Sequence, residues 1–186
     1  METPYVPHPN RALFLDVDGV LVHHGSIGGG RASGERGSFY YAAMVDPACA
    51  ARLVRVLAQT DAQVVVSSTW RQDPEQVSGL RRALLAAGLS KAQCRTFAYT
   101  EQRNDVREDA VRRYLECRAW LLGAPHVTRV LCLDDGWVSP DWAFDPLPNY
   151  FTAGLLDAHV EPAIAWLLDP TPNREGRAPL ATSKMS

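Results

Sequence analysis

The sequence predicts an α/β fold, a Rossmann-like three-layer sandwich with a mostly parallel sheet between helices. Separate apolar runs, each short enough for one strand, lie at 12–15, 64–66 and 127–133. The stretches between them have the apolar spacing of amphipathic helices. The runs are predominantly apolar rather than alternating with polar residues, which is typical of parallel strands covered on both faces.

Helix-start signals support the helical stretches. Asp-Pro pairs at 46–47 and 73–74 each place an N-cap aspartate before a proline. Asp105 followed by Glu108 resembles a capping box that opens a further helix. A last helix is expected within 155–168.

The length of 186 residues fits one domain. We expect an extended N-terminus over 1–10, a single domain over 11–168 and a disordered tail over 169–186. The glycine-rich stretch 25–37 has no periodicity and is predicted to be a flap loop.

Composition excludes several classes of protein. Apolar residues make up 46% of the chain, so a packed core is expected. The formal net charge is −2, so binding to nucleic acid or membrane through an overall positive charge is not expected. The four cysteines lack the spacing of a metal site. No signal peptide and no apolar run of membrane-spanning length is evident, so a cytoplasmic protein without a membrane partner is expected.

Polar clusters follow the three clearest strands. They lie at 16–18 (DVD), 67–69 (SST) and 134–135 (DD). Parallel strands bring such clusters to one edge of the sheet, where ligands bind. Two carboxylates about 4 Å apart repel by roughly 4 kcal/mol at an effective dielectric near 20. A hard divalent cation removes that cost and prefers oxygen ligands, so the clusters predict a Mg²⁺ site.

The order and content of these motifs resemble the haloacid dehalogenase-like (HAD) superfamily. FLDVDGVLV is similar to its first motif, VVVSSTW to its second and VLCLDDG to its fourth. The finer pattern is SSTWR, then an arginine opening a helix that reads RxxAVxxYL, then LDD. This pattern is similar to the small HAD domains associated with RNA-repair proteins.

The resemblance implies a magnesium-dependent phosphatase that acts through an aspartyl-phosphate. Asp16 would be the nucleophile, and Asp18 would protonate the leaving oxygen and later accept a proton from water. Mg²⁺ would be held by Asp16, by the backbone carbonyl of Asp18 and by Asp134. Asp135 would hold a metal-bound water.

The resemblance also implies a hydroxyl at the end of the second strand that binds a phosphoryl oxygen. Ser68 is favoured by its distance from Trp70, with Ser67 next and Thr69 third. Gly19, beside the first motif, is also assigned to substrate binding. Trp70 itself is predicted to be a core or lid aromatic.

The third motif of the superfamily is normally a lysine, and here the sequence departs from it. Arg107 is the preferred replacement, at about the second helical position after Asp105. A cation in the first turn of a helix opposes the macrodipole by about 0.3–1 kcal/mol, and local costs of this kind often mark functional sites. Arg103 and Lys91 are the alternatives.

Short spacings leave no room for a sizeable cap, because about 30 residues separate the first motif from the first helix. An open site suits a large or polymeric phosphorylated substrate, such as a nucleic-acid end. A non-catalytic HAD-like binding or scaffolding domain is the alternative function. A receiver domain is disfavoured, because it needs a lysine after a late strand. The sequence leaves the oligomeric state open.

Overall fold

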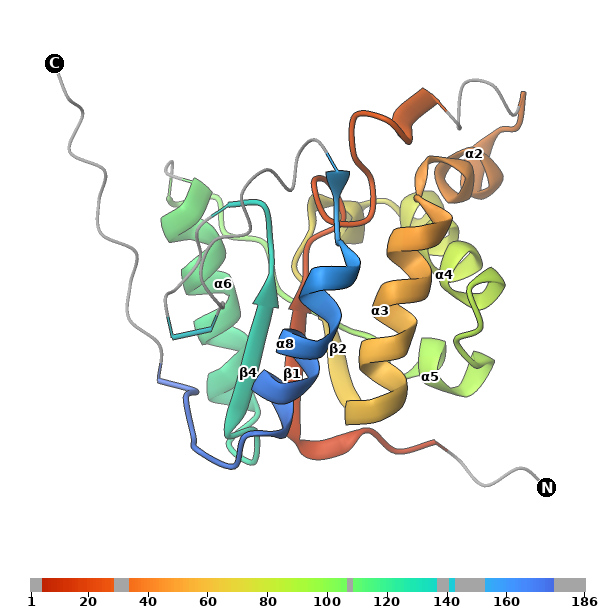
Figure 1. Cartoon of the computed structure of the whole chain (residues 1–186). Coiled ribbons are helices and arrows are strands. Elements are labelled where there is room, and N and C mark those ends of the chain that lie inside the picture. Colours follow the sequence, from red (N-terminus) through yellow and green to blue (C-terminus); the bar gives the residue numbers. More distant parts are fainter. Residues whose placement is uncertain (1–4, 29–33, 107–108, 137–140, 143–152, 176–186) are drawn as a thin grey trace, which may run out of the picture.

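The computed structural model describes residues 5–28, 34–106, 109–136, 141–142 and 153–175. Four parallel strands form one sheet in the order β3-β2-β1-β4 (Figure 1), which confirms the predicted α/β fold. The strands are β1 (His8–Leu15), β2 (Ala62–Val66), β3 (Ala98–Tyr99) and β4 (Arg129–Leu133).

Strand register brings the predicted motifs level with one another. Leu15 pairs with Val66 on one side and with Leu133 on the other. The residues after these three strand ends therefore start side by side at one edge of the sheet, as the parallel arrangement predicts.

Helices cover both faces of the sheet (Figure 1). The side chain of Asp46 accepts hydrogen bonds from two backbone N–H groups of α3, and that of Asp73 accepts one from α4, so both Asp-Pro pairs begin helices as predicted. The helices are α2 (Gly37–Met44), α3 (Pro47–Thr60), the 3₁₀ helix η1 (Thr69–Gln72), α4 (Pro74–Ala86), α5 (Lys91–Arg95), α6 (Asp109–Gly123) and α8 (Asp157–Leu168).

The sequence does not predict α2, because its residues form no buried apolar face. It has eight residues, and it is the longest described element between β1 and α3. Among the described residues, no helix has both the length and the apolar composition to cross a bilayer.

Alternate residues of β1 belong to two separate cores. Leu13 and Leu15 pack with residues of α3, α4 and α8. Ala12 and Phe14 pack with residues of α6 on the other face. The sheet is therefore buried on both sides, which explains why its central strand is a continuous apolar run.

The structure describes part of each predicted chain end. His8 and Ala62 already pair as strand partners, so β1 begins within the segment predicted as an extended N-terminus over 1–10. Residues 169–175, predicted to be disordered, pack against the domain. The Asn173 side chain accepts from the backbone N of Val130 at 2.7 Å and donates to its carbonyl oxygen at 2.8 Å. Residues 176–186 lie outside the described part.

The predicted flap over 25–37 is described only at its two ends. Ile27 packs against the core beside β1, and α2 begins at Gly37. Residues 29–33 lie outside the described ranges.

Candidate active site

The candidate site lies where the strand order reverses. The chain passes from β1 to β2 and β3 on one side and returns to β4 on the other, so the reversal lies between β1 and β4. Ligands bind at this point in open α/β sheets. Asp16 follows β1 there, and its backbone N donates to the Leu133 carbonyl oxygen at 2.9 Å.

Three carboxylates meet at this reversal. Oxygens of Asp16, Asp134 and Asp135 all lie within 4.8 Å of one another. Asp16 is 5% exposed, and the Asp134 side chain is 7% exposed. Asp135 is exposed. A cluster of carboxylate oxygens without nitrogen or sulfur ligands fits a hard divalent cation such as Mg²⁺.

The electrostatics of the carboxylates agree with this fit. Burial and the charge of Asp16 raise the pKa of Asp134 to about 7, although Arg113 and the backbone N–H of Gly136 oppose the rise. Partial loss of hydration and the charge of Asp16 also raise the pKa of Asp135 and of Asp18, although both residues are exposed. The protein groups therefore leave part of the mutual repulsion uncompensated, as expected where a cation is to bind.

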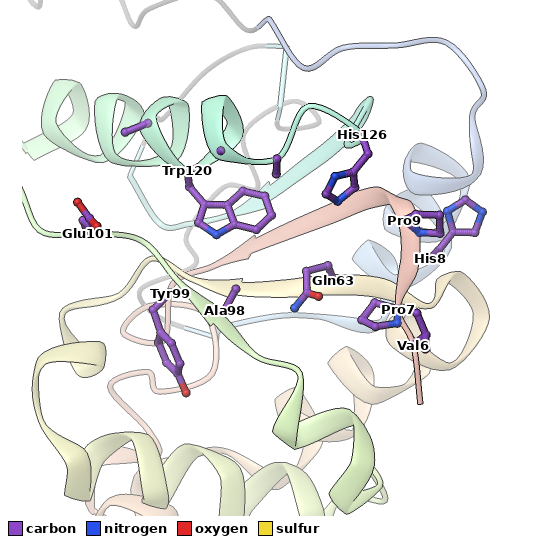
Figure 2. Close-up of a pocket in the computed structure, with 13 residues that line it drawn as sticks. Val6, Pro7, His8, Pro9, Gln63, Ala98, Tyr99, Glu101, Trp120 and His126 are labelled. Atoms are coloured by element: carbon purple, nitrogen blue, oxygen red, sulfur yellow. The ribbon is translucent and has the colours of Figure 1, made fainter. Parts of the chain in front are cut away.

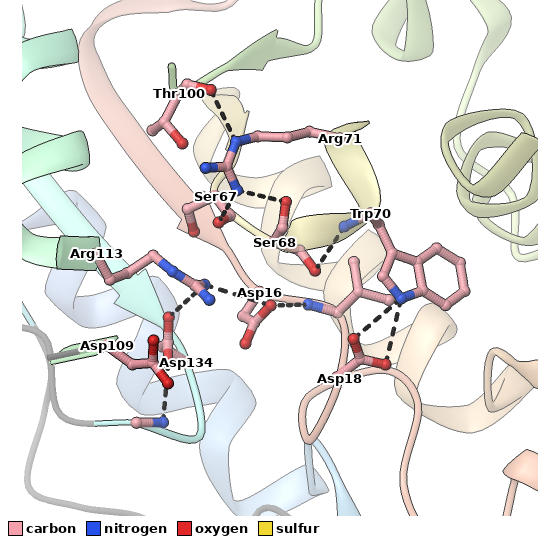
Figure 3. Close-up of polar contacts among 12 residues, drawn as sticks. Asp16, Asp18, Ser67, Ser68, Trp70, Arg71, Thr100, Asp109, Arg113 and Asp134 are labelled. Carbon is pink, nitrogen blue, oxygen red and sulfur yellow. Dashed lines mark hydrogen bonds and ion pairs between the residues drawn. The ribbon is translucent and has the colours of Figure 1, made fainter. Parts of the chain in front are cut away.

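Arg113 of α6 is the cation that the described structure brings to the carboxylates (Figure 3). Its Nη1 lies 2.9 Å from Oδ2 of Asp134 and 3.4 Å from Oδ1 of Asp16. Burial disfavours the charged guanidinium, but the charges of Asp16 and Asp134 outweigh burial and raise the pKa of Arg113. Sequence reasoning missed this residue.

The three predicted cations are placed differently. Arg103 pairs with Asp105, with its Nη2 2.6 Å from Oδ2, and Lys91 begins α5 at the far end of the sheet (Figure 1). No ion pair of the described residues joins either one to the carboxylates. Arg107 lies outside the described residues.

Asp18 has one prominent partner. The indole Nε1 of Trp70 donates to both of its carboxylate oxygens, at 3.2 and 3.1 Å (Figure 3). Asp18 is exposed, whereas Trp70 is 2% exposed. Trp70 is buried, as predicted, but it also contacts the candidate site.

The residues after β2 differ in how their hydroxyl groups are used. The Ser68 hydroxyl accepts from the backbone N of Trp70 at 3.4 Å and caps η1. The buried Ser67 hydroxyl has no hydrogen-bond partner in the described part of the chain. Leaving such a group unsatisfied costs about 1–3 kcal/mol, which makes Ser67 a candidate ligand-binding group. Thr69 is exposed.

Gly19 lies directly against the carboxylate cluster. Its φ of +80° is strained for other residues. A Cβ at this position would lie 2.5 Å from the Cβ of Asp135. The glycine therefore gives Asp135 the space it needs beside the turn after β1.

A buried ion pair braces the site from behind. Nη2 of Arg71 lies 2.8 Å from Oε2 of Glu116 in α6, and the two side chains are 6% and 2% exposed. The guanidinium also donates to the carbonyl oxygens of Ser67, Ser68 and Thr100 (Figure 3). The pair thus ties the ends of β2 and β3 to the helix that carries Arg113.

Replacing Glu116 with glutamine is expected to destabilise the protein by about 3–5 kcal/mol, because it leaves the Arg71 charge buried without its counter-charge. Urea denaturation measures the change. Glu161→Gln is the matched control, since Glu161 pairs with Arg55 at the surface at 3.6 Å. An exposed pair contributes at most about 1 kcal/mol. Equal effects of the two variants would contradict a bracing role for Glu116.

A separate hollow lies away from the carboxylates. It has a volume of about 660 Å³ and runs along α6 and the neighbouring strand β3 (Figure 2). Trp120 and Tyr99 line it, together with His8 and His126, and none of the clustered carboxylates does. The convergence of charged groups, rather than the size of a cavity, therefore identifies the candidate site.

Comparison with known proteins agrees with the sequence motifs. Residues 12–160 match the family model described as "HAD domain in Swiss Army Knife RNA repair proteins". This range contains the carboxylate cluster, Arg113 and the residues after β2. Neither the comparison with curated proteins nor that with solved structures gives a significant match. The chain therefore belongs to the family of HAD domains found in Swiss Army Knife RNA repair proteins.

Proposed function

We propose that this HAD domain is a magnesium-dependent phosphohydrolase that forms an aspartyl-phosphate on Asp16. The observation that carries the proposal is the placement of Asp16. Its buried carboxylate lies beside two further carboxylates and one guanidinium, at the strand-order reversal. Membership of the family supports hydrolase chemistry in general.

Asp16, Asp134 and Asp135, with the backbone carbonyl of Asp18, would hold Mg²⁺. Bound there, the ion would neutralise the repulsion among the carboxylates and between Asp16 and an anionic phosphoryl group. The raised pKa values of Asp134 and Asp135 support this assignment.

Two covalent steps are proposed for Asp16 and Asp18. A carboxylate oxygen of Asp16 attacks phosphorus, the bond to the leaving oxygen breaks, and Asp18 gives that oxygen a proton. Asp18 then takes a proton from the water that attacks the aspartyl-phosphate, which releases phosphate and restores Asp16. Arg113 stabilises the negative charge of the phosphoryl oxygens during both steps.

Ser67 is better suited than Ser68 to bind a phosphoryl oxygen. The Ser68 hydroxyl already caps η1, whereas the Ser67 hydroxyl lacks a partner in the described structure. Because Val66 pairs with Leu15, Ser67 lies level with Asp16 on the neighbouring strand. The exposed Thr69 and the backbone at Gly19 complete the proposed contacts with substrate.

The proposed substrate is a phosphorylated RNA end. The description of the family refers to RNA repair proteins. An open site also suits a polymer, since the longest described element between β1 and α3 is the eight-residue α2.

The first test is hydrolysis of p-nitrophenyl phosphate with magnesium and with EDTA. We expect turnover that requires magnesium. Peptide mass spectrometry after acid quenching should locate a phosphoryl group on Asp16. RNA with a 3′ or 5′ phosphate is the next substrate. No turnover, and no magnesium-dependent binding of BeF₃⁻, would instead support a non-catalytic binding or scaffolding domain.

A further inference from the structure

The indole of Trp70 holds a carboxylate that the core does not otherwise restrain. Asp18 is exposed and follows β1 in a turn, whereas Trp70 is 2% exposed. One N–H group is shared between the two carboxylate oxygens, at 3.2 and 3.1 Å. Such a contact fixes the side-chain rotation of an aspartate that would otherwise sample several rotamers.

The indole is itself fixed from two sides. Trp70 lies in η1, which is capped by Ser68 and followed by the bracing residue Arg71. Its ring meets the ring of Tyr41 of α2 edge to face, with centroids 5.6 Å apart. At Gly79, α4 leaves so little space that an added Cβ would lie 2.5 Å from the Cβ of Tyr41. The N–H donor therefore has a defined position relative to Asp18.

We infer that Trp70 is a positioning residue for the reaction: its indole N–H aims the Asp18 carboxyl group at the leaving oxygen of the substrate. This inference rests on the proposed function. A proton donor acts only within hydrogen-bond reach of the oxygen that it protonates. The shared N–H lets one carboxyl oxygen give up its proton while the other stays bound to the indole.

Trp70→Phe removes the N–H and keeps an aromatic ring. The informative measurement is kcat/KM for two aryl phosphates, p-nitrophenyl phosphate and phenyl phosphate. The nitrophenolate leaves readily without a proton, whereas the phenolate depends on Asp18. We expect the variant to lose at least about tenfold more activity on phenyl phosphate than on p-nitrophenyl phosphate, because proton transfer contributes about 10²–10⁴-fold.

The ratio of the two activities is independent of how much of the variant is folded, since both are measured on the same sample. If Trp70→Phe does not fold, the isosteric benzothienylalanine at position 70 also lacks the N–H donor. Trp166→Phe is the matched control, because its indole donates to the Val130 carbonyl oxygen at 2.8 Å, on a different part of β4 from the site. This control should keep the wild-type ratio.

A double variant separates positioning from general damage. In an Asp18→Asn background, Trp70→Phe should leave the ratio unchanged, because no proton donor remains to be aimed. Equal losses on both substrates, or a changed ratio in the Asp18→Asn background, would overturn the inference. Absence of turnover in the wild type would instead refute the proposed function itself.

Discussion

Asp16→Asn is expected to lower the turnover of phosphate esters by at least about four orders of magnitude, the scale seen when an enzyme loses its nucleophile. An amide does not attack phosphorus as a carboxylate does, so no covalent intermediate forms. Hydrolysis of p-nitrophenyl phosphate with magnesium measures the loss, and acid-quenched mass spectrometry should find no phosphoryl group at position 16.

The same variant is expected to fold at least as stably as the wild type without magnesium. Asparagine has nearly the shape of aspartate, and the lost charge is one that raises the pKa values of Asp134 and Asp135. Urea denaturation in EDTA tests this. Asp157→Asn is the control, since Asp157 pairs with Arg52 and Arg55 at the surface. If Asp16→Asn is inactive and also less stable than the wild type, then repulsion between Asp16 and the two neighbouring carboxylates does not destabilise the wild type.

Arg113→Met is expected to lower kcat/KM by about 10²–10³-fold, the scale of losing one preorganised group that stabilises the transition state. The variant also leaves the buried carboxylates without the guanidinium that contacts Asp16 and Asp134. Its melting temperature in EDTA should therefore fall below that of the wild type, and magnesium should restore more stability than it does in the wild type.

Two further variants make this test specific. Arg112→Met removes the neighbouring arginine of α6, which pairs with Asp109, and should leave kcat/KM nearly unchanged. Arg107→Met tests the cation preferred from the sequence. If Arg107→Met is more harmful than Arg113→Met, then Arg107 is the group that neutralises the phosphoryl charge.

The carboxylates of the site were predictable because their signal is local. An apolar run that stops at Asp16 or at Asp134 marks the end of a buried strand, and the parallel register then brings these ends level. The same argument located Ser67 and Ser68. The sequence favoured Ser68, because it does not reveal that the Ser68 hydroxyl caps η1.

Arg113 was not predictable from the same kind of signal. Its contact with Asp16 depends on how α6 is rotated and at what height it packs on the sheet, and several arginines lie near the start of that helix. The buried Arg71–Glu116 pair helps to fix that height, yet its partners stand 45 positions apart in the sequence. The resemblance therefore predicts that a basic side chain faces the carboxylates, but the sequence does not show which residue supplies it.

The contacts of Asn173 have a consequence for how the chain behaves beside other chains. The outward N–H of Val130 is bound by the Asn173 side chain, and that of Cys132 donates to the Trp142 carbonyl oxygen at 2.6 Å. Exposed strands with unpaired groups act as templates on which foreign strands assemble. At these two described positions, the border of the sheet at β4 is covered by the polypeptide itself. A chain cut before Asn173 would lose the partner of the Val130 N–H and would open that part of the border to strands of other chains.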